Sequence, residues 1–247
     1  MKRFYREAAA VPGEGGVGIL LDGRPVKTPA RRLLAVPTAA LAEAIAAEWN
    51  AQGEEIDPLS MQLTGLANAA IDRVAPDPGA FARGLAAYGE SDLLCYRSEG
   101  PEPLVRRQEE KWGKLLAWAR RRYDVDFEIV AGVMHRPQPA ETVERLGRAV
   151  AVRDAFRLAA LSPLVTVSGS LVVALALAEG EIGLEEAWAA ARVDEAWQAE
   201  HWGEDPLAAQ ALAARRRDFE AAYRFLTLLS APHMAVRLPL RPDGHGA

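Results

Sequence analysis

The chain has 247 residues, of which 50% are hydrophobic and 26% are charged, an ordinary globular composition that suffices for one large core or two smaller ones. Its net charge of −5, from 29 Lys and Arg against 34 Asp and Glu, argues against a nucleic-acid-binding protein, which is usually basic. The single cysteine, Cys95, excludes a disulfide within the chain and fits a reducing compartment. The charged N-terminus lacks the apolar run of a signal peptide, so we expect a cytoplasmic bacterial protein or a processed organellar one.

The first 36 residues have the pattern of short strands. A strand is expected from Phe4 onward, a hairpin with an Asp-Gly turn over residues 17–28, and a further strand over residues 33–36. The glycines of residues 13–18 resemble a dinucleotide-binding loop only superficially, because such a loop needs a helix directly after it and a hairpin follows here. We therefore interpret these glycines as a β turn.

From residue 37 the spacing of the apolar residues changes to that of helices. Two boundaries have a clear signal, because Asp77-Pro78 and Asp205-Pro206 each place an N-cap residue before a proline of the first turn. Residues 127–135 look extended, and the Pro- and Gly-rich tail of residues 231–247 is expected to be loose. The helices are expected over residues 37–49, 63–74, 77–88, 103–123, 140–161, 164–178, 184–202 and 206–229.

These elements predict an α+β fold, in which a small N-terminal antiparallel β unit with packed helices precedes a larger helical bundle. The boundary between the two parts is expected between residues 73 and 103. Residues 158–178 carry no charge and are long enough to span a bilayer, but their Ser, Thr, Pro and Gly residues make them too polar, and anchoring residues do not flank them. A buried helix without stable membrane insertion is therefore expected there.

The most distinctive segment is residues 188–205, which contain three of the six tryptophans among many carboxylates. On one continuous helix Trp188, Glu195 and Trp202 fall nearly in line, and Trp197 points to the other side. A carboxylate between two indoles is costly to bury without a partner. Glu195 is therefore either a buried structural partner of an arginine or a contact for another protein, and the pattern leaves both readings open.

The residues give little support to catalysis or to a bound metal or cofactor. The spacing of the four histidines matches no zinc motif, so we expect no metal. Cys95 lies among apolar neighbours as a small buried residue would, and the run Ser168-Gly169-Ser170 is interpreted as small residues that let helices pack closely. The remaining enzymatic alternative is acid–base chemistry by the cluster of Asp194, Glu195 and Glu200 on a small substrate.

Several sequence blocks, in the right order over residues 2–230, resemble one known family. The chain is similar to the assembly chaperones of the "ATP twelve" family, which bind the α subunit of the ATP synthase catalytic sector. The blocks are L-D-G-R-P-V-K-T-P at 21–29, A-E-A-I-A-A-E-W-N-A-Q at 42–52, M-Q-L-T-G-L-A-N-A-A-I-D at 61–72, D-L-L-C-Y-R at 92–97, S-G-S-L-V-V-A-L-A-L at 168–177 and D-E-A-W-Q-A-E-H-W-G-E-D at 194–205.

The resemblance implies an N-terminal α/β sandwich-like domain over residues 1–90, an orthogonal helical bundle over 91–230 and a tail over 231–247. It implies a non-enzymatic chaperone without cofactor, monomeric when free, that shields the new α subunit until the β subunit replaces it. Relatives in organelles act in the mitochondrial matrix. The last block is the expected partner-binding site, with Glu195 as the leading residue and Asp194, Gln198 and Trp202 beside it.

Overall fold

The computed structural model describes residues 1–132, 134–203 and 205–230. A small antiparallel sheet opens the chain, in which β2 is central, β1 pairs along one side of it, and β3 and β4 pair with the two ends of its other side. The strands are β1 (Ala8–Gly13), β2 (Gly16–Leu21), β3 (Arg24–Pro25) and β4 (Ala35–Val36). The predicted hairpin over residues 17–28 is confirmed, but the strand expected from Phe4 begins only at Ala8, because the Tyr5 hydroxyl donates to the Trp49 carbonyl in the first helix, Ala39–Asn50.

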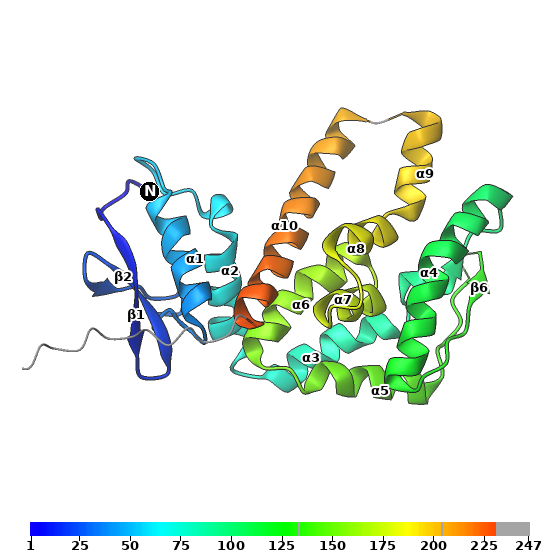
Figure 1. Cartoon of the computed structure of the whole chain (residues 1–247), viewed down its shortest axis with the longest axis horizontal. Helices are drawn as coiled ribbons and strands as arrows, with labels where there is room; N and C mark the ends of the chain where they lie inside the picture. Colours follow the sequence, from blue (N-terminus) through cyan, green and yellow to red (C-terminus); the bar gives the residue numbers. More distant parts are fainter. Residues whose placement is uncertain (133, 204, 231–247) are drawn as a thin grey trace, which may run out of the picture.

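Helices make up most of the remaining described residues (Figure 1). The predicted α+β class is confirmed. The helices are α1 (Ala39–Asn50), α2 (Gln62–Ala69), α3 (Pro78–Ala86), α4 (Glu102–Tyr123), α5 (Ala140–Ala151), α6 (Ala155–Ser168), α7 (Leu171–Ala178), α8 (Leu184–Ala191), α9 (Val193–Trp202) and α10 (Pro206–Ser230). Shorter helical turns lie at Pro58–Ser60, Ala70–Val74, Ala87–Gly89 and Leu93–Cys95, and a two-residue parallel pair joins β5 (Tyr96–Arg97) to β6 (Val130–Ala131).

The two predicted helices over residues 140–161 and 164–178 have other boundaries than the apolar pattern indicates. The helix expected over 140–161 stops at Ala151, because Asp154 caps a new helix by accepting the Arg157 backbone N–H at 2.9 Å. That new helix, α6, continues through Pro163, where the pattern places an end. The interpretation of residues 168–170 as small residues inside a helix is wrong: Gly169 ends α6 with a positive φ of 65°, and the Ser170 hydroxyl caps α7.

The apolar side chains gather in two cores. One lies between the sheet and helices α1 and α2 and contains Ile19, Leu41 and Ile45. The other lies among the helices from α3 to α8 and contains Trp112 and Leu158. Helices α6 and α10 contribute to both cores, so they join the N-terminal unit to the bundle. The domain boundary near residue 90 stays a prediction.

The uncharged stretch of residues 158–178 is the centre of the second core rather than a membrane span. All residues of α7 from Leu171 to Leu177 are almost or fully buried, and only its last residue, Ala178, is partly exposed. Within the described ranges, each helix is too short or too polar to cross a bilayer. The tail prediction concerns residues 231–247, which lie outside the described residues.

Candidate functional site

The segment expected as one tryptophan-bearing helix is two helices. Helix α8 ends at Ala191, Arg192 has a non-helical backbone (φ −127°, ψ 24°), and α9 starts at Val193. A tertiary hydrogen bond accounts for the break, since the Trp112 indole N–H donates to the Ala190 carbonyl at 2.8 Å, the oxygen that a continuous helix would use four residues later. The expected common face of Trp188, Glu195 and Trp202 is therefore wrong.

The three tryptophans of this segment have different surroundings. Trp188 lies against Phe219 in the core, with the guanidinium groups of Arg192 and Arg216 over its ring at 5.4 and 5.1 Å. Trp197 is half-buried and stacks on His201 at a ring distance of 4.1 Å. Trp202 is 78% exposed, which is unusual for the largest apolar side chain and is typical of a contact surface.

Helix α9 is held on α4 at its first turn by a polar cluster. Gln108 is fully buried and donates from Nε2 to the Asp194 carboxylate at 2.6 Å. The same amide also donates to the Ser98 hydroxyl and accepts from the Ser98 backbone N–H. Asp194 therefore faces the interior of the protein and orients α9, since a buried amide without this acceptor would be destabilising.

A second attachment lies near the end of α9. Arg107 donates two hydrogen bonds to Glu200, at 2.7 and 2.9 Å, and its guanidinium lies 5.1 Å from the centre of the Trp197 ring. The hydrogen bond from Arg107 holds the pKa of the Glu200 carboxyl below its usual value. Together with the Gln108–Asp194 bond, this pair fixes the face of α9 that points toward α4.

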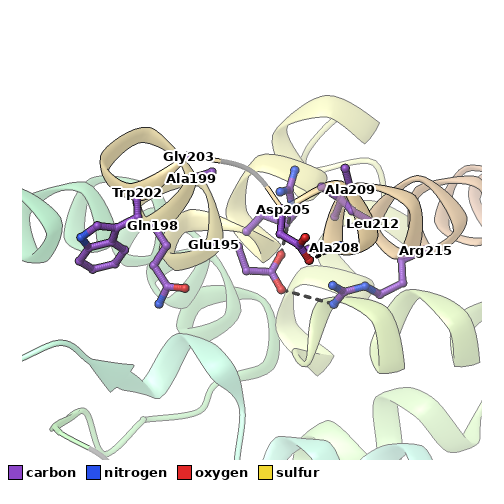
Figure 2. Close-up of a pocket in the computed structure, with 11 residues that line it drawn as sticks. Glu195, Gln198, Ala199, Trp202, Gly203, Asp205, Ala208, Ala209, Leu212 and Arg215 are labelled. Carbon is purple, nitrogen blue, oxygen red and sulfur yellow. Dashed lines mark hydrogen bonds and ion pairs between the residues drawn. The ribbon is translucent and has the colours of Figure 1, made fainter.

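The other face of α9 borders a surface hollow of about 320 Å³ between α9 and α10 (Figure 2). Its apolar lining comes from Ala199, Ala208, Ala209 and Leu212. The other lining residues are Arg192, Glu195, Gln198, Trp202, Gly203, Asp205 and Arg215. Helix α9 and the exposed half of α10 (residues 206–218) project together from the body of the bundle (Figure 1), and we call them the α9–α10 arm.

Glu195 lies at the edge of this hollow and interacts with two arginines. One carboxylate oxygen is 3.1 Å from Arg192 Nε and the other 3.3 Å from Arg215 Nη1. The expected pairing of Glu195 with an arginine of a neighbouring helix is present, but the Glu195 side chain is 46% exposed, so the pair is not buried. An exposed ion pair of this kind stabilises a fold by only about 0–1 kcal/mol.

The structure brings together three of the four predicted partner-binding residues. Glu195, Gln198 and Trp202 line the hollow, whereas Asp194 faces Gln108 on α4. The pattern missed the α10 side of the hollow, with Leu212 and Arg215. The sequence did contain one signal for the α10 side. Asp205 is the N-cap of α10, as expected, and accepts from the Ala208 N–H at 3.1 Å. It lies three residues after the end of α9, so the two helices follow each other closely along the chain.

The geometry gives no support to the enzymatic alternative. Asp194 and Glu200 face α4, where Gln108 and Arg107 bind them separately, and Glu195 pairs with two arginines on the other side of α9, so none of the three carboxylates is hydrogen-bonded to another. Cys95 is fully buried, as expected, and burial raises the pKa of its thiol to about 12. In the part of the chain that the structure describes, no three His, Cys, Asp or Glu side chains are grouped to hold a metal ion.

Comparisons with known proteins agree with this architecture. The family model described as ATP12 chaperone protein matches residues 2–120. The crystal structure of Atp12 from Paracoccus denitrificans is 43% identical, with a TM-score of 0.88, over 92% of this chain and 98% of that chain. A protein of Agrobacterium tumefaciens described as a candidate chaperone has the same identity and TM-score, over 92% and 86% of the two chains. The mitochondrial protein atp12 of Schizosaccharomyces pombe is 26% identical over 214 residues, which are 82% of this chain and 74% of that relative.

Proposed function

The chain belongs to the ATP12 chaperone family, and we propose that it acts in ATP synthase assembly by binding the unassembled α subunit. In this role the chain keeps the α subunit of the catalytic sector from aggregating until the β subunit takes its place. The similarity to Atp12 extends over nearly the whole chain, including the helical part that carries the arm. We further propose that it acts where the catalytic sector is assembled, in the bacterial cytoplasm or the mitochondrial matrix, and that it is monomeric when free.

The physical need for such a chaperone follows from the architecture of a ring. A subunit of an alternating α/β ring exposes its interfaces until its neighbours bind, and exposed apolar interfaces aggregate. A protein that covers such a surface with mixed apolar and charged contacts can leave again by exchange, without nucleotide hydrolysis. The chaperone surface therefore needs apolar area and charge close together.

The observation that carries the proposal is the exposed surface of the α9–α10 arm. Trp202 and Leu207 are 78% and 75% exposed, on either side of the connection between the two helices. The half-exposed carboxylate of Glu195 lies in the same hollow as the Trp202 side chain. Exposed aromatic residues beside a charged group are typical of residues that dominate binding energy in protein interfaces.

Co-expression with the cognate α subunit tests the proposal. We expect the two proteins to co-elute in size-exclusion chromatography, and the purified chain to suppress light scattering when denatured α subunit is diluted into buffer. A matched β subunit is the control for selectivity, because it exposes the complementary ring interfaces. Absence of co-elution together with unchanged scattering of the α subunit would contradict the proposed function.

A further inference from the structure

The ion pair between Glu195 and Arg215 is an exchangeable contact across the hollow. Among the described residues it is the one hydrogen bond or ion pair that joins α9 to α10, and Figure 2 shows it as the dashed line between the two side chains. Its two side chains are 46% and 49% exposed. Since exposed pairs change an equilibrium constant by at most about fivefold, another cation can replace Arg215 at small cost.

Arg192 is positioned to orient Glu195 independently of Arg215. Its second carboxylate oxygen stays 3.1 Å from Arg192, whose side chain is only 22% exposed and lies over the Trp188 ring. The first oxygen, released by Arg215, then accepts a new donor at the edge of the hollow. A carboxylate that is held on one side and free on the other is a preorganised acceptor for a charge-assisted hydrogen bond.

We propose that a lysine or arginine of the bound partner replaces Arg215 on Glu195, and that an aliphatic side chain beside this cation enters the hollow. An aliphatic side chain fits the hollow for two reasons. Its lining includes the apolar residues Ala199, Ala208, Ala209 and Leu212, and its volume of about 320 Å³ is large enough. The identity of the partner, the α subunit, rests on the proposed function. The inference adds which kind of α-subunit segment is recognised, namely a cation next to an aliphatic side chain.

The charge distribution favours a cation over an anion in this position. Helix α9 carries three carboxylates and neither lysine nor arginine, and the whole chain has a net charge of −5. An anion that bound Arg215 would lie beside the carboxylates of Glu195 and Asp205, which line the same hollow. Like charges at that separation repel, whereas a cation that takes the place of Arg215 meets the carboxylates of Glu195 and Asp205, with Arg192 already paired to Glu195.

The substitution Arg215→Gln tests whether Arg215 competes with the partner for Glu195 or contacts the partner itself. If Arg215 competes with the partner's cation, its removal tightens the complex with purified α subunit about two- to fivefold, measured as Kd by fluorescence titration. If Arg215 instead contacts the partner, the same change weakens binding. Arg217→Gln is the matched control, because Arg217 is exposed on the same helix, loses the same charge and does not line the hollow.

A double-mutant cycle isolates the pair. We expect Glu195→Gln to weaken binding. In that background Arg215→Gln should have no further effect on Kd, because the carboxylate for which Arg215 and the partner's cation compete is already gone. Equal effects of Arg215→Gln and Arg217→Gln, or a weaker complex with Arg215→Gln alone, would overturn the proposal. Each variant changes an exposed side chain, so its melting temperature is expected to match that of the parent.

A partner-free measurement separates this inference from the proposed function. The probe is an acetylated tripeptide of leucine, lysine and leucine, with glutamate in place of lysine in the control peptide. We expect the lysine peptide alone to shift the carboxyl NMR signal of Glu195. If it does so while the α subunit fails to bind, the proposed function is contradicted and the hollow chemistry stands. Equal or larger shifts with the glutamate peptide contradict the hollow chemistry itself.

Discussion

The N-terminal sheet unit and the α9–α10 arm use charged residues in opposite ways. Every ion pair among the described residues lies between positions 97 and 220, so none belongs to the sheet unit. There, carboxylates bind backbone N–H groups instead: Asp22 accepts from Arg6 and Glu7, and Glu48 accepts from Leu63 and Thr64. The arm is held by side-chain pairs such as Arg107–Glu200 and Glu195–Arg215.

The two regions also differ in how much of them is buried. In helix α1 four residues are buried, Leu41, Ala42, Ile45 and Ala46. In α9 only Val193 is buried, and in α10 no residue before Phe219 is buried. Apolar burial and backbone hydrogen bonds hold the side chains of the sheet unit in a single arrangement. The residues of an exposed ion pair can instead bind new partners at little cost in free energy. The sheet unit therefore has the features of a stable platform, and the arm has those of the binding surface that we propose.

Matched leucine truncations should show the largest difference between the two regions. We expect Leu41→Ala, at a fully buried position of α1, to lower the free energy of unfolding by about 2–5 kcal/mol. Leu207→Ala, at a position 75% exposed, should change it by less than about 0.5 kcal/mol. Urea unfolding followed by circular dichroism measures both. Similar losses for the two variants would mean that the arm is packed as tightly as the sheet unit.

The buried amide that holds α9 should give the next largest effect. Gln108→Leu removes the donor to Asp194 and leaves that carboxylate without its partner, so we expect a loss of about 1–3 kcal/mol in stability. Gln210→Leu, on the exposed face of α10, is the control for the same change in side chain and should be nearly neutral. A neutral Gln108→Leu variant would show that the amide does not orient α9.

A charge reversal in each region tests where the partner binds. Glu195→Lys should weaken α-subunit binding at least about tenfold, or 1.4 kcal/mol, while the helical circular dichroism signal and the melting temperature stay nearly unchanged. Glu43→Lys, on the exposed side of α1, makes the same change in net charge and should leave binding intact. A collapsed melting temperature for Glu195→Lys would instead assign Glu195 a structural role.

The smallest expected effect is a change in a carboxyl pKa, which distinguishes a carboxylate bound by backbone N–H groups from one bound by an arginine side chain. Backbone N–H groups of Glu7 and Arg6 lower the pKa of Asp22, and the hydrogen bond from Arg107 lowers that of Glu200. Because both pKa values are lower in the folded state, each group stabilises the fold above its ordinary pKa, and this contribution is lost as the pH falls through the folded value. Arg107→Gln should return the Glu200 pKa toward 4.5 and leave that of Asp22 unchanged in an NMR titration. Equal shifts at both sites would contradict a local cause.

Local signals in the sequence predicted the elements that depend on neighbouring residues. The Asp-Gly turn between β2 and β3 and the caps Asp77 and Asp205 lie where the pattern indicates. Each of these is a short-range hydrogen bond or backbone preference, so a few residues suffice to specify it. The burial of Cys95 was equally predictable, since its neighbours are apolar.

The candidate site was predicted only in part. Glu195, Gln198 and Trp202, which the family resemblance indicates, do line one hollow, but the face that the helical period assigns to Trp188, Glu195 and Trp202 does not exist. The α10 side of the hollow was not predicted, since the contact between Glu195 and Arg215 joins residues twenty positions apart on separate helices. A helical period describes only the order of side chains along one helix and contains no information about its neighbour.

The α+β class, the caps and turns and the family resemblance could all be predicted from the amino-acid sequence, because they depend on local patterns and on ordered blocks of residues. Tertiary contacts decided where the tryptophan-bearing segment breaks into two helices and which side of α9 is exposed. The Trp112 indole takes the Ala190 carbonyl and ends α8, and Gln108 and Arg107 turn Asp194 and Glu200 toward α4. A hydrogen bond to a distant residue competes with the helix's own bond, and no pattern within the helix records that competitor.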